Sequence, residues 1–202
     1  RGEMFETPCT TGAVTVAGAG VFGLSAALEL ARRGRRVRVV SPGPVPHPLA
    51  ASTDITKAIR ADYGADAFYA ELMERALDGW AAWNEAWPTP LYHPSGVAFL
   101  AGEAMRPGGF EHDSWALLGA RGFPLRRLEG GFAPFSQRYP DGYFNPRAGW
   151  AASGAVVARL AEEATAAGVQ IEAGRVDRVE GPMVLALGAW TPGILPELAD
   201  RM

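Results

Sequence analysis

Residues 14–31 read VTVAGAGVFGLSAALELA, and this stretch decides the fold of the chain. A short β-branched run enters three glycines spaced as G-x-G-x-x-G, Gly18, Gly20 and Gly23, which open into a segment rich in alanine and leucine. The first glycine allows a sharp turn, the second a close approach of a pyrophosphate to the backbone, and the third close packing of helix on strand. The stretch therefore predicts a strand, a phosphate-binding loop and a helix.

The residues that follow complete a β–α–β unit. Leu24, Leu28 and Ala31 recur at helical spacing, Gly34 is typical of a helix end, and residues 36–40 read RVRVV, a second strand. An anion at the start of this helix would meet unpaired N–H groups and a favourable helix dipole. The alternative is a glycine-rich turn in a parallel sheet that holds no ligand.

The composition bounds the function. The chain has 202 residues, of which 48% are hydrophobic and 20% charged, which predicts an ordinary globular protein of one or two domains. A net charge of -3 favours neither nucleic acid nor a membrane surface as a partner, and no apolar run reaches the roughly 20 residues that cross a bilayer. The one cysteine, Cys9, excludes an internal disulfide and favours a reducing compartment. The three histidines lack metal-ligand spacing, so we expect no metal site.

Residues 51–64, ASTDITKAIRADYG, form a second informative stretch. If Lys57 and Arg60 lie on a helical turn, their spacing brings both cations to one side. The alternative is a solvated basic face.

The remaining elements follow from hydrophobic periodicity and from helix start and stop signals. We expect a strand at 96–100, a helix from Ser114 to near Gly122, a helix capped by Ser153 that ends near 167, and strands at 169–173 and 184–187. Residues 65–87 predict a long helix whose apolar stripe packs on a core, with an aromatic substrate box as the alternative. The stripe consists of Phe68, Leu72, Ala76, Trp80, Trp83 and Trp87.

Four segments, in this order, resemble FAD-dependent amine oxidoreductases of the D-amino-acid oxidase and sarcosine oxidase type, most closely the fungal fructosyl-amino-acid, saccharopine and pipecolate oxidases. They read GAGVFGLSAALELARRG (18–34), DITKAIRADYG (54–64) with the aromatic helix after it, YPDGYFNPRAGW (139–150) and LALGAWTP (185–192). The resemblance implies an α/β fold. A Rossmann-like FAD-binding domain, a parallel sheet with helices, would comprise 13–87 and 145–202. Part of a mixed-sheet substrate domain would comprise 88–144.

The resemblance also implies an activity. Such enzymes oxidise the C–N bond of a secondary amine or N-substituted amino acid to an imine, and oxygen becomes hydrogen peroxide. Because full members of the family are longer, the chain resembles a truncated member that lacks the C-terminal half. A face exposed by the truncation would then allow self-association.

The resemblance assigns cofactor-binding residues by their place in the matching segments. The pyrophosphate would be held by Gly18, Gly20, Val21, Phe22 and Gly23. Ser41 stands where such sites usually carry Asp or Glu for the ribose, and a serine can still hydrogen-bond a ribose without the strength of a carboxylate. Val176, in the strand after the late helix, would line the adenine, and the other side of the dinucleotide would be closed by Gly188, Ala189 and Trp190. Ser52 and Thr56 would lie near the pyrophosphate or the flavin.

Two residues are implied as catalytic. Lys57 would lie against the isoalloxazine ring of FAD, where a cation stabilises reduced flavin and helps to activate oxygen. Arg60 would receive a substrate carboxylate. Two other functions stay open: a non-catalytic dinucleotide-binding or interaction module, and a nicotinamide-dependent dehydrogenase. We expect a cytoplasmic or peroxisomal location, although the last three residues are not a peroxisomal targeting tripeptide.

Overall fold

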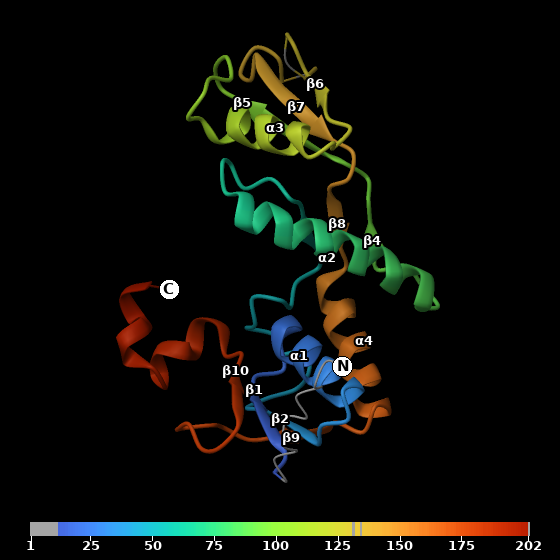
Figure 1. Cartoon of the computed structure of the whole chain (residues 1–202), viewed down its shortest axis with the longest axis vertical. Coiled ribbons are helices and arrows are strands. Elements are labelled where there is room, and N and C mark those ends of the chain that lie inside the picture. Colours follow the sequence, from blue (N-terminus) through green and yellow to red (C-terminus); the bar gives the residue numbers. More distant parts are fainter. Residues whose placement is uncertain (1–11, 131, 134, 202) are drawn as a thin grey trace, which may run out of the picture. The chain divides into compact units, whose positions relative to one another are not determined.

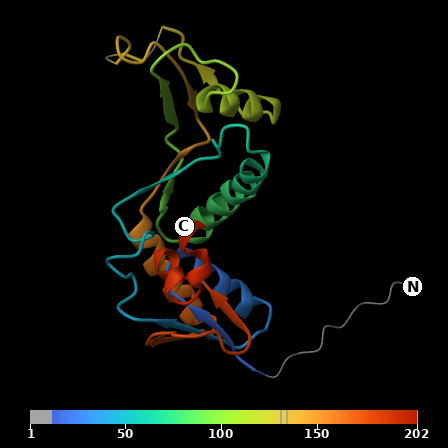
Figure 2. The ribbon, with the colours of Figure 1, turned by 90° about the vertical axis from the view of Figure 1, so that its left-hand side faces the viewer.

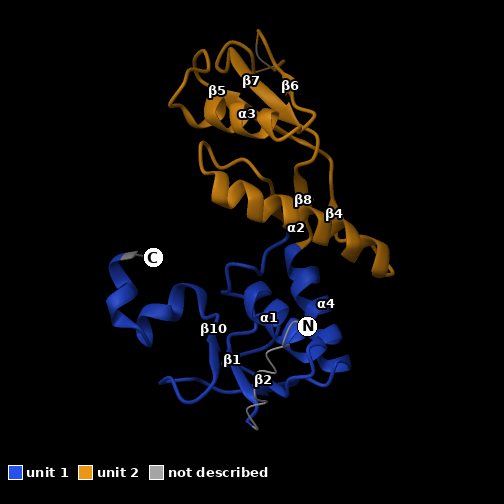
Figure 3. Cartoon of the chain, in the orientation of Figure 1, with its two compact units in different colours: residues 1–55, 153–202 blue, residues 56–152 orange. Residues whose placement is uncertain are grey.

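The computed structural model describes residues 12–130, 132–133 and 135–201 (Figure 1). The chain forms two compact units, which are coloured separately in Figure 3. Unit 1 is Arg1–Ile55 with Ser153–Met202, and unit 2 is Thr56–Ala152. Cys9, from which we inferred a reducing compartment, lies outside the described residues. Among the described residues, no helix is both long and apolar enough for a membrane crossing.

Unit 1 is built on a four-stranded sheet in the order β10-β1-β2-β9, and all of its neighbouring strands are parallel. The strands are β1 Val14–Ala17, β2 Val37–Ser41, β9 Gln170–Ala173 and β10 Met183–Leu185. In the register of this sheet, Ala17 is opposite both Val40 and Leu185. The segments that follow β1, β2 and β10 therefore begin at one edge of the sheet, which is where parallel sheets bind ligands.

Two helices pack on this sheet and on each other: α1 Val21–Arg32, which follows β1, and α4 Ser153–Ala166, which precedes β9 (Figure 1). Their inward residues repeat at helical spacing, and the core between helices and strands contains Val16, Leu24, Val39, Val156, Val157 and Leu160, all at most 1% exposed. This arrangement confirms the predicted α/β fold with a parallel sheet and helices. Two 3-10 helices, η1 Gly188–Gly193 and η2 Pro196–Arg201, follow β10.

The start of α4 differs from the prediction in one respect. Ser153 is the first residue of the helix, and its hydroxyl donates to the backbone carbonyl of Asp54 at 3.0 Å. The N–H of Gly154 donates to the same carbonyl at 3.0 Å. The helix start is thus held by a carbonyl from a distant part of the chain, and Ser153 is not its cap.

Unit 2 contains two three-stranded antiparallel sheets, in the orders β3-β8-β4 and β5-β7-β6 (Figure 2). The first sheet consists of β3 Lys57–Ile59, β4 Tyr92–His93 and β8 Gly149–Ala151. The second consists of β5 Val97–Ala101, β6 Arg126–Arg127 and β7 Asp141–Asn145. The helices of this unit are α2 Ala67–Ala86 and α3 Phe110–Ala120.

The long helix α2 confirms the element predicted at 65–87, but its stripe is only partly buried. Ala70 and Leu77 are buried in a cluster with Tyr92, Leu118 and Phe123. In contrast, the predicted core residues Phe68 and Leu72 are 67% and 43% exposed. The buried face of α2 is decided by what packs against it, which periodicity alone does not show.

The tryptophans of this stretch pack on one another. Trp80 meets Trp83 edge-on, Trp83 stacks on Trp87 with ring centroids 5.0 Å apart, and Trp80 lies 5.7 Å from Tyr92. These contacts agree with the expected packing role.

The helix α3 begins four residues before the predicted start at Ser114. Gly109 is its N-cap, and two acidic residues, Glu111 and Asp113, occupy the first turn. Their negative charges interact favourably with the positive end of the helix dipole. Ser114 is fully buried, and its hydroxyl accepts the N–H of Gly64 at 2.7 Å. Ser114 therefore does not begin the helix, and its hydroxyl joins α3 to the segment after β3.

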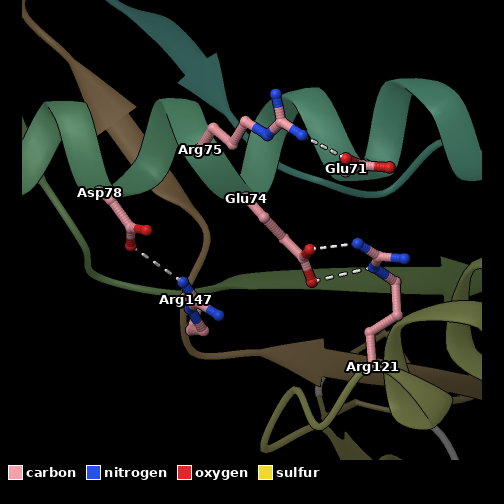
Figure 4. A network of polar contacts seen from close by, with 6 residues as sticks. All are labelled: Glu71, Glu74, Arg75, Asp78, Arg121 and Arg147. Carbon is pink, nitrogen blue, oxygen red and sulfur yellow. Dashed lines mark hydrogen bonds and ion pairs between the residues drawn. The ribbon is translucent and has the colours of Figure 1, made fainter. Parts of the chain in front are cut away.

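A network of ion pairs links α2 to other parts of unit 2 (Figure 4). The carboxylate of Glu74 accepts two hydrogen bonds from the guanidinium of Arg121, directly after α3. Arg147 lies 3.7 Å from Asp78, and its guanidinium is 4.4 Å from the ring centroid of Phe123. Because these groups are partly solvated, they orient the elements more than they stabilise the unit.

The boundary between the units lies at residue 55, whereas we expected the cofactor domain to extend to 87. Residues 56–87 belong to unit 2 because β3 pairs with β8 and α2 contributes to the core around Tyr92 and Leu118. Residues 145–152 belong to unit 2 for the same reason. The assignment of a cofactor role to one part and a substrate role to the other stays a prediction.

Candidate dinucleotide-binding site

Two of the three glycines of the first loop, Gly18 and Gly23, lie where neighbouring backbone leaves no room for a side chain. Gly18 has φ of +105°, and a Cβ there would lie 2.3 Å from the carbonyl oxygen of Ala186, just after β10. A Cβ on Gly23 would lie 1.9 Å from the carbonyl oxygen of Gly18. Gly18 and Gly23 thus allow β1, α1 and the chain after β10 to meet, as the sequence predicts.

The middle glycine stands at the start of the helix. Gly20 is the N-cap of α1 and makes no side-chain hydrogen bond to the helix, and the first turn carries no acidic residue. The first N–H groups of a helix have no acceptor within it, so this end is suited to an anion. The N–H of Val21 donates to the hydroxyl of Ser52 at 3.2 Å. The loop of residues 18–23, called the phosphate loop below, is therefore in contact with Ser52, which we predict to lie near the pyrophosphate or the flavin.

The other predicted cofactor residues of unit 1 lie at the same edge of the sheet. Ser41 is the last residue of β2, is 4% exposed, and its carbonyl accepts the N–H of Gly174 at 2.9 Å. Gly188 begins η1 three residues after the end of β10, with Ala189 and Trp190 next to it. The structure thus brings Ser41, the phosphate loop and residues 188–190 together at one sheet edge.

Val176 does not lie in a strand, contrary to the prediction. β9 ends at Ala173, where its pairing with β2 also ends at Ser41. Val176 is in the irregular segment three residues further on. Its predicted contact with an adenine stays a prediction.

Thr56, Lys57 and Arg60 belong to unit 2. Lys57 begins β3 and pairs with Ala151 of β8, so the helical turn that would bring Lys57 and Arg60 to one side does not form. Arg60 follows directly after β3, which ends at Ile59, so the two cations do not share a helical face. Their predicted roles do not depend on that turn and stay predictions.

Arg60 has an environment that suits an anion. Its guanidinium carbon lies 5.0 Å from the ring centroid of Tyr63 and 5.7 Å from that of Phe110. Its Nη1 atom is buried and has no hydrogen-bond partner among the described residues. A buried donor without a hydrogen-bond acceptor is unfavourable, and a ligand that accepts a hydrogen bond from it removes this cost.

Sequence reasoning missed a buried polar cluster beside Arg60. Asp62 is fully buried, and its two carboxylate oxygens accept hydrogen bonds from the hydroxyl of Tyr143 at 2.6 Å and from the side-chain amide of Asn145 at 2.9 Å. Burial raises the pKa of Asp62, and burial together with the adjoining Asp62 raises the pKa of Tyr143. A signal was present, because all three residues lie in the segments 54–64 and 139–150 that carry the family resemblance.

Two further residues of unit 1 were also missed. The Oγ1 atom of Thr53, next to Ser52, is buried and has no hydrogen-bond partner among the described residues. The ring of His47 meets the indole of Trp190 edge-on, with centroids 5.8 Å apart. Local residue spacing indicates neither the buried hydroxyl of Thr53 nor the contact between His47 and Trp190.

The parallel sheet, the phosphate loop at the start of α1 and the level strand ends together define a dinucleotide-binding unit. The family model of the FAD dependent oxidoreductases matches residues 13–202. The chain therefore belongs to the FAD dependent oxidoreductase family.

Known proteins similar to this chain are longer than it. L-saccharopine oxidase of Schizosaccharomyces pombe is 38% identical over 69 residues, which are 33% of this chain and 16% of that protein. Glycine oxidase from Geobacillus kaustophilus matches with a TM-score of 0.76 and 19% identity over 92% of this chain and 57% of its own, which shows the fold. Fructosamine oxidase (Amadoriase II) from Aspergillus fumigatus matches with a TM-score of 0.66 and 26% identity over 90% of this chain and 48% of its own. The chain thus spans about half the length of these solved structures.

FAD is the cofactor of this family, and the residues of unit 1 fit it. Gly18 and Gly23 let the loop fold closely onto the neighbouring backbone, and Gly20 carries no side chain where the helix begins. The start of α1 places the first backbone N–H groups of the helix at this loop, where they suit a diphosphate, and the buried Oγ1 of Thr53 has no hydrogen-bond partner in the described part of the chain. The diphosphate would be held by the phosphate loop, with Ser52 beside it.

Proposed function

We propose that this chain supplies the FAD-binding part of an oxidase that acts on the C–N bond of a secondary amine or an N-substituted amino acid. The observation that carries this proposal is the phosphate loop at the start of α1, which is in contact with Ser52 and with the chain after β10. The products would be an imine and hydrogen peroxide.

The substrate class rests on two observations. The chain is similar to proteins named L-saccharopine oxidase and fructosamine oxidase, which supports an amine or amino acid as the substrate. The buried Nη1 of Arg60, which has no hydrogen-bond partner within the described ranges and whose guanidinium lies near two aromatic rings, supports a carboxylate on that substrate.

When bound, FAD supplies a two-electron acceptor, so that the substrate loses two electrons and two protons as C–N becomes C=N, and oxygen takes up both to give hydrogen peroxide. The chain's own residues would bind and orient. Arg60 would hold the substrate carboxylate, and the ammonium group of Lys57 would stabilise negative charge on the cofactor ring and favour oxygen reduction. Ser41 would hydrogen-bond the ribose, and Val176 would contact the adenine.

An absorption spectrum tests the cofactor, and a peroxide assay tests the activity. The purified chain is mixed with FAD, passed through gel filtration and inspected for a flavin band, and hydrogen peroxide is then measured with N-substituted amino acids. The expected result is a yellow protein with amine-dependent peroxide. Gly20→Ala is the matched control, because it changes the phosphate loop and leaves unit 2 untouched.

Other results would favour other functions. A yellow protein without peroxide favours the non-catalytic dinucleotide-binding module, and thermal stabilisation by NAD but not FAD favours a nicotinamide-dependent dehydrogenase. A protein that stays colourless and is stabilised by neither refutes the proposal.

The proposal includes a cytoplasmic or peroxisomal location and self-association. Size-exclusion chromatography at two protein concentrations tests the latter, since a dimer would elute earlier at the higher concentration.

A further inference from the structure

Two segments at the carboxyl edge of the parallel sheet meet through one pair of aromatic rings. The first segment follows β2 and contains His47, and the second is η1, which follows β10 and contains Trp190. The imidazole of His47 meets the indole of Trp190 at an interplanar angle of 76°, with centroids 5.8 Å apart. Edge-to-face contacts of this kind between rings are attractive.

His47 is held in position from several sides. Its Nδ1 accepts the N–H of Leu49 at 3.2 Å, and its carbonyl accepts the N–H of Ala50 at 3.0 Å. Its ring passes directly over Gly43, where a Cβ would lie 2.7 Å from the ring. The imidazole is therefore presented by its own turn, and Gly43 leaves the space for it.

Both segments are also in contact with the phosphate loop. A few residues after His47, the hydroxyl of Ser52 accepts the N–H of Val21. Shortly before Trp190, the carbonyl oxygen of Ala186 faces Gly18 so closely that no Cβ fits between them. Each segment thus has one end at the phosphate loop, and the two are joined again through the ring pair.

We propose that His47 and Trp190 form a latch that joins these two segments and slows the release of the dinucleotide cofactor. The inference rests on the proposed binding of FAD and adds a residue, His47, that the glycine motif and the family resemblance do not assign. Trp190 is 49% exposed, so its ring is only partly covered by the protein, and His47 is one of the residues that contact it. Loss of the latch would let the two segments separate without disturbing the sheet.

The experiment measures the rate at which FAD leaves the loaded chain after rapid dilution, followed by flavin fluorescence. His47→Ala removes the ring, and we expect release to become about three- to tenfold faster, the range that one aromatic pair supports. His47→Phe keeps a ring against Trp190 but loses the Nδ1 acceptor, and we expect release close to that of the unchanged chain. Gly43→Ala keeps both rings but displaces the imidazole, and we expect faster release as well.

A matched control lies in unit 2, where the ring of His93 stacks on Trp150 with centroids 4.0 Å apart. His93→Ala removes a histidine–tryptophan pair that belongs to the other unit, and we expect FAD release to be unchanged. The melting temperature of each chain without FAD separates a latch from a structural contact. If His47→Ala lowers that temperature but leaves the release rate within twofold, the latch is refuted.

The failure of the latch and the failure of the proposed function give different results. If the unchanged chain binds no FAD, both are overturned. If it binds FAD and His47→Ala and Gly43→Ala release it at the same rate as the unchanged chain, the latch alone is overturned.

Discussion

Replacing two glycines of the phosphate loop one at a time separates folding from cofactor binding. In Gly23→Ala the new Cβ would lie 1.9 Å from the carbonyl oxygen of Gly18. Because that oxygen belongs to the backbone, the loop and the start of α1 must shift. Forcing a methyl group into a packed site costs about 1–3 kcal/mol. Because this contact is severe, we expect Gly23→Ala to lower the free energy of unfolding by about 3 kcal/mol.

Gly20→Ala acts differently. Gly20 has φ of -80° and ψ of -178°, which any residue adopts, and its added Cβ would lie 3.0 Å from the hydroxyl of Ser52, a side chain that can turn away. The helix N-cap preference and the entropy of the unfolded chain oppose each other, so we expect a change in unfolding free energy within about 1 kcal/mol. The methyl group nevertheless occupies the space that a diphosphate needs beside the start of α1.

The expected loss of FAD affinity follows from one hydrogen bond. A hydrogen bond to a charged group contributes about 1.5–3 kcal/mol. Its loss in Gly20→Ala would therefore raise the Kd for FAD about ten- to a hundredfold.

Urea unfolding of the chain without FAD and calorimetric titration with FAD measure the two effects. We expect Gly23→Ala to lower the urea midpoint, and Gly20→Ala to keep the midpoint and lose FAD affinity. A Gly20→Ala chain that binds FAD like the unchanged protein would refute the placement of the diphosphate on this loop. A Gly23→Ala chain with an unchanged midpoint would refute the packing argument.

Three further predictions concern polar groups. Ser52→Ala removes the acceptor of the Val21 N–H and should lower the free energy of unfolding by about 1 kcal/mol in urea titrations, while Ser52→Thr, which keeps the hydroxyl, should not. The guanidinium of Arg127 lowers the pKa of Asp141 from 3.8 to about 2. The stability from this pair is therefore present above pH 3.8 and is lost as the pH falls towards 2. Arg127→Met should make the free energy of unfolding less dependent on pH in this range. Burial raises the pKa of Asp62, so its effect on stability has the opposite pH dependence. Its contribution to the free energy of unfolding is greatest below pH 3.8 and is lost as the pH rises through the raised pKa. Asp62→Asn should therefore remove this loss of stability with rising pH, as measured by urea titrations across pH. A pH profile of Asp62→Asn parallel to that of the unchanged chain would contradict the last of these.

Some wrong predictions have a common origin in long-range contacts. The segment with Lys57 forms a strand and not a helical turn because β8, far along the chain, pairs with it. Ser114 does not begin α3 because its hydroxyl is used by Gly64, fifty residues earlier. Phe68 and Leu72 have the spacing of core residues, but the buried cluster of α2 gathers around Ala70 and Leu77. In each case a partner distant in sequence overrides the local preference.

Local sequence is sufficient to predict the β1–α1–β2 unit and its phosphate loop. Every requirement of that unit is local: the turn at Gly18, the approach of α1 at Gly23 and the apolar spacing of the helix all lie within a few residues of one another. Only the tertiary structure decided what surrounds the loop. Ser52 and Ala186 reach it from segments far apart in the chain, and the His47–Trp190 pair joins those two segments to each other. The parallel sheet brings the segments to one edge because its strands end level. Contacts of this kind depend on strand order and register, which no local pattern of residues contains.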